Sequence, residues 1–159
     1  MNEKKIAFLK SEFIPLLKQL NPGGAPRWGK MNAQQMVEHV TAFFKVSSGR
    51  LRLPLVTPAE QLPKFREWLM TEKPFRENTK APSSIVPDEP LPLRNADMNE
   101  AVAQLEKSVE EFFLCFKERD ASKTTLHPVF GELNFSEWIQ LHHKHVTHHL
   151  KQFGIEIVS

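Results

Sequence analysis

Histidines gather near the C-terminal end of the chain, where five of the seven lie within eight residues. The surrounding residues 134–153 have the spacing of an amphipathic helix, which turns ~100° per residue. A histidine side chain can move protons near neutral pH and is the commonest metal ligand. So many histidines, some of them facing a core, indicate a functional site. The five are His142, His143, His145, His148 and His149.

The spacing of His145 and His149 predicts a metal site. Residues at i and i+4 stand on the same side of a helix, about one turn apart. A third histidine, His39, falls at the edge of the apolar face of a helix predicted to begin at Asn32. Metal sites in helical bundles are built from side chains of facing helices. Three imidazoles would leave a fourth position for water or substrate, which is the pattern of a catalytic zinc site.

Spacing alone leaves other histidine pairs open. His142 lies closer to the centre of the apolar arc than His145. Its ring would stand about 10 Å from that of His149 along the helix axis, which is too far for one metal. His142 and His145, at i and i+3, could still share one. His143 and His148 point away from the arc and are predicted to lie on the surface.

Several other side chains are candidates for the lining of this site. Trp138, one turn before His142, is predicted to form a wall of the pocket. His127 and Glu132 lie in the connector that leads into the last helix, and they are the nearest candidates for a general base or for hydrogen bonds to the metal ligands. The chain has no tyrosine, so proton transfer would depend on histidines and carboxylates. Cys115 has no obvious base beside it and is predicted to be a buried small residue.

The elements that position these residues are predicted to be helices. Apolar side chains recur at three- and four-residue steps in four long segments and one short one. Asn32 and Asn134 each have a Gln or Glu three residues later, which is the spacing of a capping box. No strand pair is predicted, so the sequence favours an all-α bundle. The predicted helices cover residues 3–20 with a kink at Pro15, a segment that begins at Asn32, residues 97–117 and residues 134–153, with the short helix at 57–70.

Residues 50–97 differ in kind from the rest. Eight of the twelve prolines lie between Pro54 and Pro92, so no long helix can cross the segment. Residues 74–97 are predicted to form an extended crossover loop. A loop of this length usually covers a site or makes a long connection, here between parallel neighbouring helices. We predict one helical domain over residues 1–159.

Composition excludes several classes of protein. A net charge of +2 and the lack of a clustered basic face argue against nucleic-acid binding. No apolar run approaches the ~20 residues of a membrane span, and the N-terminal segment is not a signal peptide. A single cysteine allows no internal disulfide, so a cytoplasmic location is expected.

Two motifs resemble the DinB-like superfamily, in particular an uncharacterised branch of it. They are WGKMNAQQMVEHV at residues 28–40 and HPVFGELNFSEWIQLHHKHVTHHLKQFG at residues 127–154. A Pro-rich middle segment with an Ala-Pro step at Ala81 and Pro82 adds to the likeness, which covers most of the chain.

The resemblance implies a four-helix bundle of up-down-down-up connectivity with a three-histidine site for a divalent metal. One ligand comes from the second helix and two, at i and i+4, from the last. Carried over by motif, the ligands are His39, His145 and His149, which leaves His142 as a pocket residue or as a partner of the ligands. The resemblance implies zinc or nickel, with iron or manganese as alternatives. The superfamily includes thiol-dependent transferases and isomerases.

The expected function is therefore that of a metal-dependent enzyme. Its metal would activate water or a low-molecular-weight thiol for attack on a small electrophile, as in a hydrolase or a thiol S-transferase. The alternative is a non-catalytic helical module that binds metal or forms a homodimer. Apolar residues expected on an outward face, such as Phe8 and Leu114, motivate that alternative.

Overall fold

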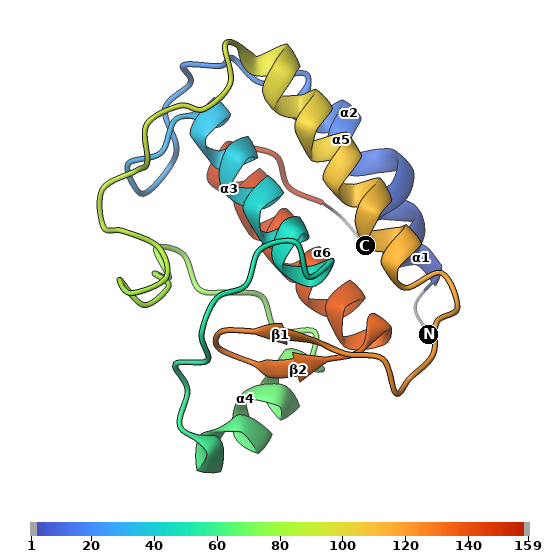
Figure 1. The fold of residues 1–159 in the computed structure, drawn as a ribbon. Coiled ribbons are helices and arrows are strands. Elements are labelled where there is room, and N and C mark those ends of the chain that lie inside the picture. Colours follow the sequence, from blue (N-terminus) through green and yellow to red (C-terminus); the bar gives the residue numbers. More distant parts are fainter. Residues whose placement is uncertain (1–2, 158–159) are drawn as a thin grey trace.

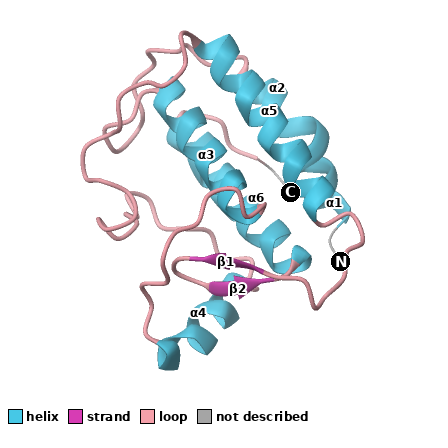
Figure 2. Cartoon of the chain, viewed as in Figure 1, coloured by secondary structure: helices cyan, strands magenta, loops and turns pink. Residues whose placement is uncertain are grey.

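The structure is a computed structural model and describes residues 3–157. It is mostly helical, with one small antiparallel hairpin (Figures 1 and 2). Its elements in chain order are α1 (Glu3–Ala7), the π-helical turn η1 (Phe8–Glu12), α2 (Phe13–Leu17), α3 (Ala33–Ser47), the 3-10 turn η2 (Ala59–Gln61), α4 (Leu62–Leu69), α5 (Met98–Cys115), β1 (Thr125–His127), β2 (Gly131–Leu133) and α6 (Phe135–Gln152).

The long helices form the expected up-down-down-up bundle. In Figure 1 the N-terminal helical segment runs upward, α3 and α5 both run downward, and α6 runs upward. Helices α3 and α5 pack along each other as parallel neighbours, and α6 packs against α3 and α1. The long connection between α3 and α5 is the crossover that this arrangement requires, and α4 is the expected short extra helix. The core contains side chains from every helix of the bundle, including Leu9, Phe44, Phe112 and Ile139.

The N-terminal helix contains a widened turn instead of a simple kink. Residues 8–12 are π-helical, immediately before the short helix that contains Pro15. Proline cannot donate to the carbonyl four residues earlier, here that of Ser11, and its ring would clash with that carbonyl in a regular helix. A π-turn that includes Ser11 relieves this conflict. The segment therefore stays helical from Glu3 to Leu17, three residues short of the predicted end.

The starts of α3, α5 and α6 were predicted correctly because side-chain caps define them, whereas α4, which has no side-chain cap, begins at Leu62, later than predicted. Asn32 and Asn134 each accept a hydrogen bond from the backbone N–H three residues later, and Gln35 and Glu137 complete the two capping boxes. Asp97 caps α5 by accepting from the N–H of Glu100. The caps at Asn32 and Asn134 fix the starts of α3 and α6, the two helices that carry the clustered histidines. The positions of the histidines along these helices therefore follow from the sequence.

The prediction that the chain has no strand pair is wrong. In the connector before α6, β1 pairs with β2 in antiparallel register, with His127 opposite Gly131 and Leu126 opposite Glu132. Gly131 has a φ of +80°, a conformation that favours glycine. The indole N–H of Trp138 donates to Oγ1 of Thr125 at 2.8 Å. The hairpin is thereby attached to the first turns of α6.

A second hydrogen bond attaches the hairpin to the other histidine-bearing helix. Thr125 Oγ1 donates to the backbone carbonyl of Ser47, at the end of α3, at 2.7 Å. Val56 and Thr57 of the crossover also bond the hairpin turn, because the Val56 N–H donates to the carbonyl of Pro128 and the Thr57 hydroxyl donates to that of Val129. The hairpin therefore connects α3, α6 and the crossover segment.

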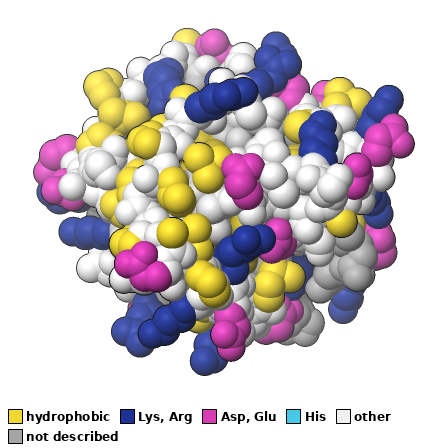
Figure 3. Space-filling view, turned by 60° about the horizontal axis from the view of Figure 1, so that its bottom comes forward, with side chains coloured by type: hydrophobic (Ala, Val, Ile, Leu, Met, Phe, Trp, Pro, Cys, Tyr) yellow, Lys and Arg dark blue, Asp and Glu magenta, His cyan; other side chains and the backbone are white. Residues whose placement is uncertain are grey.

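The molecular surface mixes charges of both signs. On the face drawn in Figure 3, Lys and Arg side chains alternate with Asp and Glu, and apolar side chains gather on one side of the view; no described histidine is visible on this face. Of the two residues expected to form an outward apolar face, Leu114 is exposed but Phe8 is buried against Phe13 and His143. No helix within residues 3–157 is long and apolar enough to span a membrane.

Candidate metal centre

The structure brings together His39 from α3 with His145 and His149 from α6. The Nε2 atom of His145 lies 3.0 Å from that of His39 and 3.1 Å from that of His149. Among the described residues, this trio is the one group of His, Cys, Asp or Glu side chains whose ligand atoms converge closely enough for a metal, within 4.8 Å of one another. Residues 106 positions apart in the chain thus meet at one point.

The geometry of the trio fits a divalent metal. Zinc binds imidazole nitrogen at about 2.0–2.1 Å in tetrahedral sites, which places neighbouring ligand nitrogens about 3.3 Å apart. The two measured separations are close to that value. All three donors are imidazole nitrogens, a donor set suited to zinc, nickel, copper or iron rather than to magnesium or calcium. Three ligands leave at least one coordination position for another molecule.

The surroundings of the trio keep its imidazoles neutral. Burial lowers the pKa of His39 to about 4, and the nearby charge of His148 adds to that effect. Burial likewise holds the pKa values of His145 and His149 well below the ordinary histidine value. Only a neutral imidazole has a lone pair to offer a metal. The site is therefore ready to accept a cation at neutral pH.

Gln152 orients one of the three rings, and the sequence reasoning missed it. The Nδ1–H of His149 donates to Oε1 of Gln152 at 2.7 Å, which directs the Nε2 lone pair toward the other two histidines. The amide of Gln152 is itself fixed, because its Nε2 donates to the backbone carbonyl of Trp28 at 2.8 Å. The available signal was a glutamine three residues after a candidate ligand. Only the fold shows that the loop at Trp28 holds that glutamine in place.

Replacing Gln152 is expected to weaken metal binding without removing a ligand. Gln152→Leu keeps the bulk but leaves His149 Nδ1–H without an acceptor, and we expect roughly 10- to 100-fold weaker zinc binding, measured by competition with a chelator. Gln152→Glu keeps an acceptor for Nδ1–H, so it should lose less affinity than the leucine variant. Equal affinity of the leucine variant and the wild type would show that Gln152 does not orient the ligand.

His142 occupies the core one turn from the trio. Its side chain is almost fully buried and stacks on Phe44 with ring centroids 3.8 Å apart. The Ser47 hydroxyl donates to the carbonyl of Phe44, so it accepts from the Nε2–H of His142 at 2.8 Å. His142 contributes to the inner wall of the pocket, but its Nε2 bonds Ser47 and not a member of the trio.

His143 and His148 are not the exposed surface residues that the helix pattern predicted. Both are half-buried. His143 packs edge-on against Phe8, and His148 lies between Trp28 and Phe75, which come from two different loops. Both burials depend on segments far away in the sequence, which no pattern within α6 could reveal.

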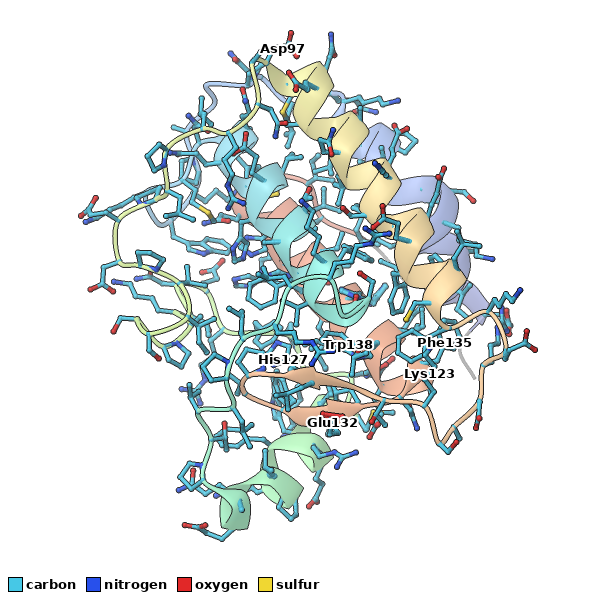
Figure 4. All side chains as sticks on the ribbon, in the orientation of Figure 1. Asp97, Lys123, His127, Glu132, Phe135 and Trp138 are labelled. Carbon is cyan, nitrogen blue, oxygen red and sulfur yellow. The ribbon has the colours of Figure 1, made fainter. Side chains whose placement is uncertain are left out.

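The other three candidate pocket residues divide into two groups. Trp138 and His127 are buried, lie beside each other and line the pocket (Figure 4). Glu132 lies on the opposite side of the hairpin, is exposed and accepts a hydrogen bond from the Thr124 hydroxyl. The structure therefore places Glu132 outside the pocket. Side chains alternate along a strand, so Glu132 points outward while Leu133 points inward, and Gly131 is buried.

The three histidines open onto a pocket of about 1510 Å³. The crossover segment supplies much of the pocket wall, through residues 73–76, 78–82 and 85–91, so this segment lies over the site as well as connecting α3 to α5. Its prolines lack backbone N–H donors and add apolar contacts to this wall, which also carries charged side chains such as Arg76 and Lys80. Aromatic side chains on the pocket surface include Phe43, Phe65, Trp68, Phe75, Phe130 and Trp138.

Comparison with known proteins places the chain in a family. No curated protein and no solved structure is significantly similar to it. One family, described as "Protein of unknown function (DUF1569)", matches residues 10–155. That match includes every histidine of the trio together with Gln152, His127 and the crossover segment. The chain belongs to the DUF1569 family.

Proposed function

We propose that this DUF1569 protein is a metal-dependent enzyme in which the centre formed by His39, His145 and His149 activates a small nucleophile, water or a low-molecular-weight thiol, for attack on a small electrophile. The observation that carries the proposal is the convergence of three neutral imidazoles, with at least one coordination position to spare, at the wall of a large pocket. A purely structural metal site would be closed by a fourth protein ligand.

The residues of the chain have defined parts in this proposal. The trio would hold zinc or nickel, and Gln152 would keep His149 in the binding orientation. A divalent metal with three uncharged ligands is a strong Lewis acid, which lowers the pKa of water and deprotonates a thiol. The aromatic and proline side chains of the pocket would exclude bulk water and contact an apolar substrate.

The surroundings of the acidic side chains in the pocket favour a thiol over water as the nucleophile. The buried Glu38 accepts hydrogen bonds from the backbone N–H groups of Arg94 and Asn95, and Glu89 pairs with Lys30. Glu38 is therefore not free to act as a general base, and the other acidic residues of the pocket wall, Asp88 and Glu89, are exposed on the crossover segment. A thiol needs such a base less than water does, because its unperturbed pKa is far lower. The resemblance to the DinB-like superfamily, which includes thiol-dependent transferases and isomerases, also supports this choice.

The proposal is tested first by metal content. The purified protein should carry close to one equivalent of zinc or nickel, or take up one on titration, and the variant with alanine at all three histidines should carry none. Cobalt-loaded protein should then show a new sulfur-to-metal absorption band when a small thiol such as cysteine is added. Unchanged metal content in the triple variant would refute the metal centre. A missing thiol band would leave water as the nucleophile.

A further inference from the structure

His127 is held in one tautomer by the hairpin turn. Its Nδ1 atom accepts hydrogen bonds from the backbone N–H groups of Val129 at 3.0 Å and Phe130 at 3.3 Å. A ring nitrogen that accepts two N–H groups cannot carry a proton, so the proton of the neutral ring is on Nε2. The turn thus converts this histidine into a hydrogen-bond donor whose direction is fixed.

The ring of His127 is also fixed in place by its neighbours. It is buried and contacts Phe43, Phe130 and Trp138, with ring centroids 5.8, 5.2 and 5.6 Å away. Phe43 contacts the metal centre as well, because its ring lies 5.2 Å from that of His39 and 5.3 Å from that of His145. His127 and two members of the trio therefore contact the same phenylalanine, and all of them line one pocket, within reach of one small molecule.

The Nε2–H of His127 has no acceptor among residues 3–157, since every hydrogen bond found for this ring is made by Nδ1. The described residues contain no fully buried side-chain nitrogen or oxygen without a partner, so this N–H must reach open space. The space that His127 lines is the pocket of the metal centre. A rigid polar hydrogen on an otherwise aromatic wall is a typical feature of a ligand site.

We propose that His127 is the residue that selects the substrate, by donating its Nε2–H to an acceptor oxygen such as that of a ketone, aldehyde or ester. The substrate would then be an apolar oxo compound that reaches from the metal past Phe43 to His127. This inference rests on the proposed function, in which the metal centre activates the nucleophile that attacks the other end of the substrate. Burial lowers the pKa of His127 to about 3. The donor therefore stays uncharged at neutral pH, which suits a neutral carbonyl oxygen better than a carboxylate.

His127 could instead have a purely structural role, as the side chain that closes the turn. In that case its loss would change the stability of the protein and not its preference among ligands. Asparagine presents an oxygen near the position of Nδ1 and bonds backbone N–H groups two or three residues later. His127→Asn should therefore keep the turn while taking the donor away from the Nε2 position, because the asparagine amide nitrogen would lie near the position of the ring carbon Cδ2. The free energy of unfolding of this variant, measured by denaturant titration, reports separately on the turn.

The experiment compares matched ligands on wild-type and His127→Asn protein loaded with zinc. The probes are straight-chain alkyl hydroxamic acids, which bind metals, and keto derivatives in which the ketone moves along the chain one carbon at a time. In the wild type, one keto position should bind about threefold to tenfold more tightly than the plain chain, as one neutral hydrogen bond would provide. In His127→Asn this gain should vanish, while the affinity for the plain chain stays within about twofold.

The outcomes separate the inference from the function on which it rests. If plain hydroxamates fail to bind zinc-loaded wild type, the proposed metal centre fails, and the role of His127 fails with it. If they bind but no keto position gains affinity, or if the gain persists in His127→Asn, the metal centre stands and the selective role of His127 is refuted. If the variant does not fold, the wild-type series still refutes the role of His127 when no keto position gains affinity.

Discussion

His145→Ala is expected to lower the affinity for zinc roughly 100-fold or more, the largest effect of any single substitution in this protein. Its Nε2 atom lies 3.0 Å from that of His39 and 3.1 Å from that of His149, so it is close to both other ligand nitrogens. Binding free energies of about 10–16 kcal/mol for four-ligand zinc sites correspond to ~2.5–4 kcal/mol for each ligand. Chelator competition with the purified variant measures the loss directly.

His143→Ala is the matched control for that substitution. It removes an imidazole from the same helix two residues away, and this ring packs against Phe8 and not against the trio. Zinc affinity should remain within about threefold of the wild type, because a distant ring contributes no ligand atom. If His143→Ala and His145→Ala lose zinc equally, the effect comes from damage to α6 and not from loss of a ligand.

Acidification is expected to unfold the metal-free protein between about pH 6.5 and pH 4. Burial lowers the pKa of His39 to about 4 and that of His127 to about 3. In the unfolded chain these histidines titrate near the ordinary value of about 6.5. Below that pH the unfolded state binds more protons than the folded state, so stability falls as the pH falls.

The loss of stability on acidification is large enough to unfold the protein. A difference of one pKa unit is worth about 1.4 kcal/mol, so each of these two histidines removes about 3 kcal/mol or more once the pH reaches its folded-state pKa. Domains of this kind are stable by about 5–15 kcal/mol in total. Far-ultraviolet circular dichroism in the presence of a chelator should show a cooperative loss of helix across this range, and zinc should move the midpoint to lower pH. A helical signal and a free energy of unfolding that stay constant from pH 7 to pH 4 would contradict the burial of these neutral rings.

The bundle could be predicted from the sequence because its signals are local. Capping residues define where α3, α5 and α6 begin, and apolar repeats define the faces that they bury. Helical spacing made His145 and His149 a candidate pair and made His39 a candidate third ligand, but it left His142 open as a rival. The choice of His145 over His142 depended on a family resemblance, and the structure brings His39, His145 and His149 together.

The hairpin could not be predicted because its strands have only three residues each. An alternating pattern needs about four residues or more to be recognised. Without the strands, the opposite directions of His127 and Glu132 could not be derived, so both were candidates for the pocket. The surroundings of Gln152 and His148 could not be predicted either, because their partners come from distant loops. Gln152 bonds Trp28, and His148 packs against Phe75.

X-ray absorption at the zinc edge of the zinc-loaded protein tests the central claim most directly. The account predicts one zinc per chain, with imidazole nitrogens at about 2.0–2.1 Å whose scattering fits three histidines and one light atom from solvent. The His143→Ala variant should give the same spectrum, and the His145→Ala variant should lose the three-histidine signal. A shell of oxygen atoms without imidazole, or sulfur at about 2.3 Å in protein free of added thiol, would show that His39, His145 and His149 are not the metal site.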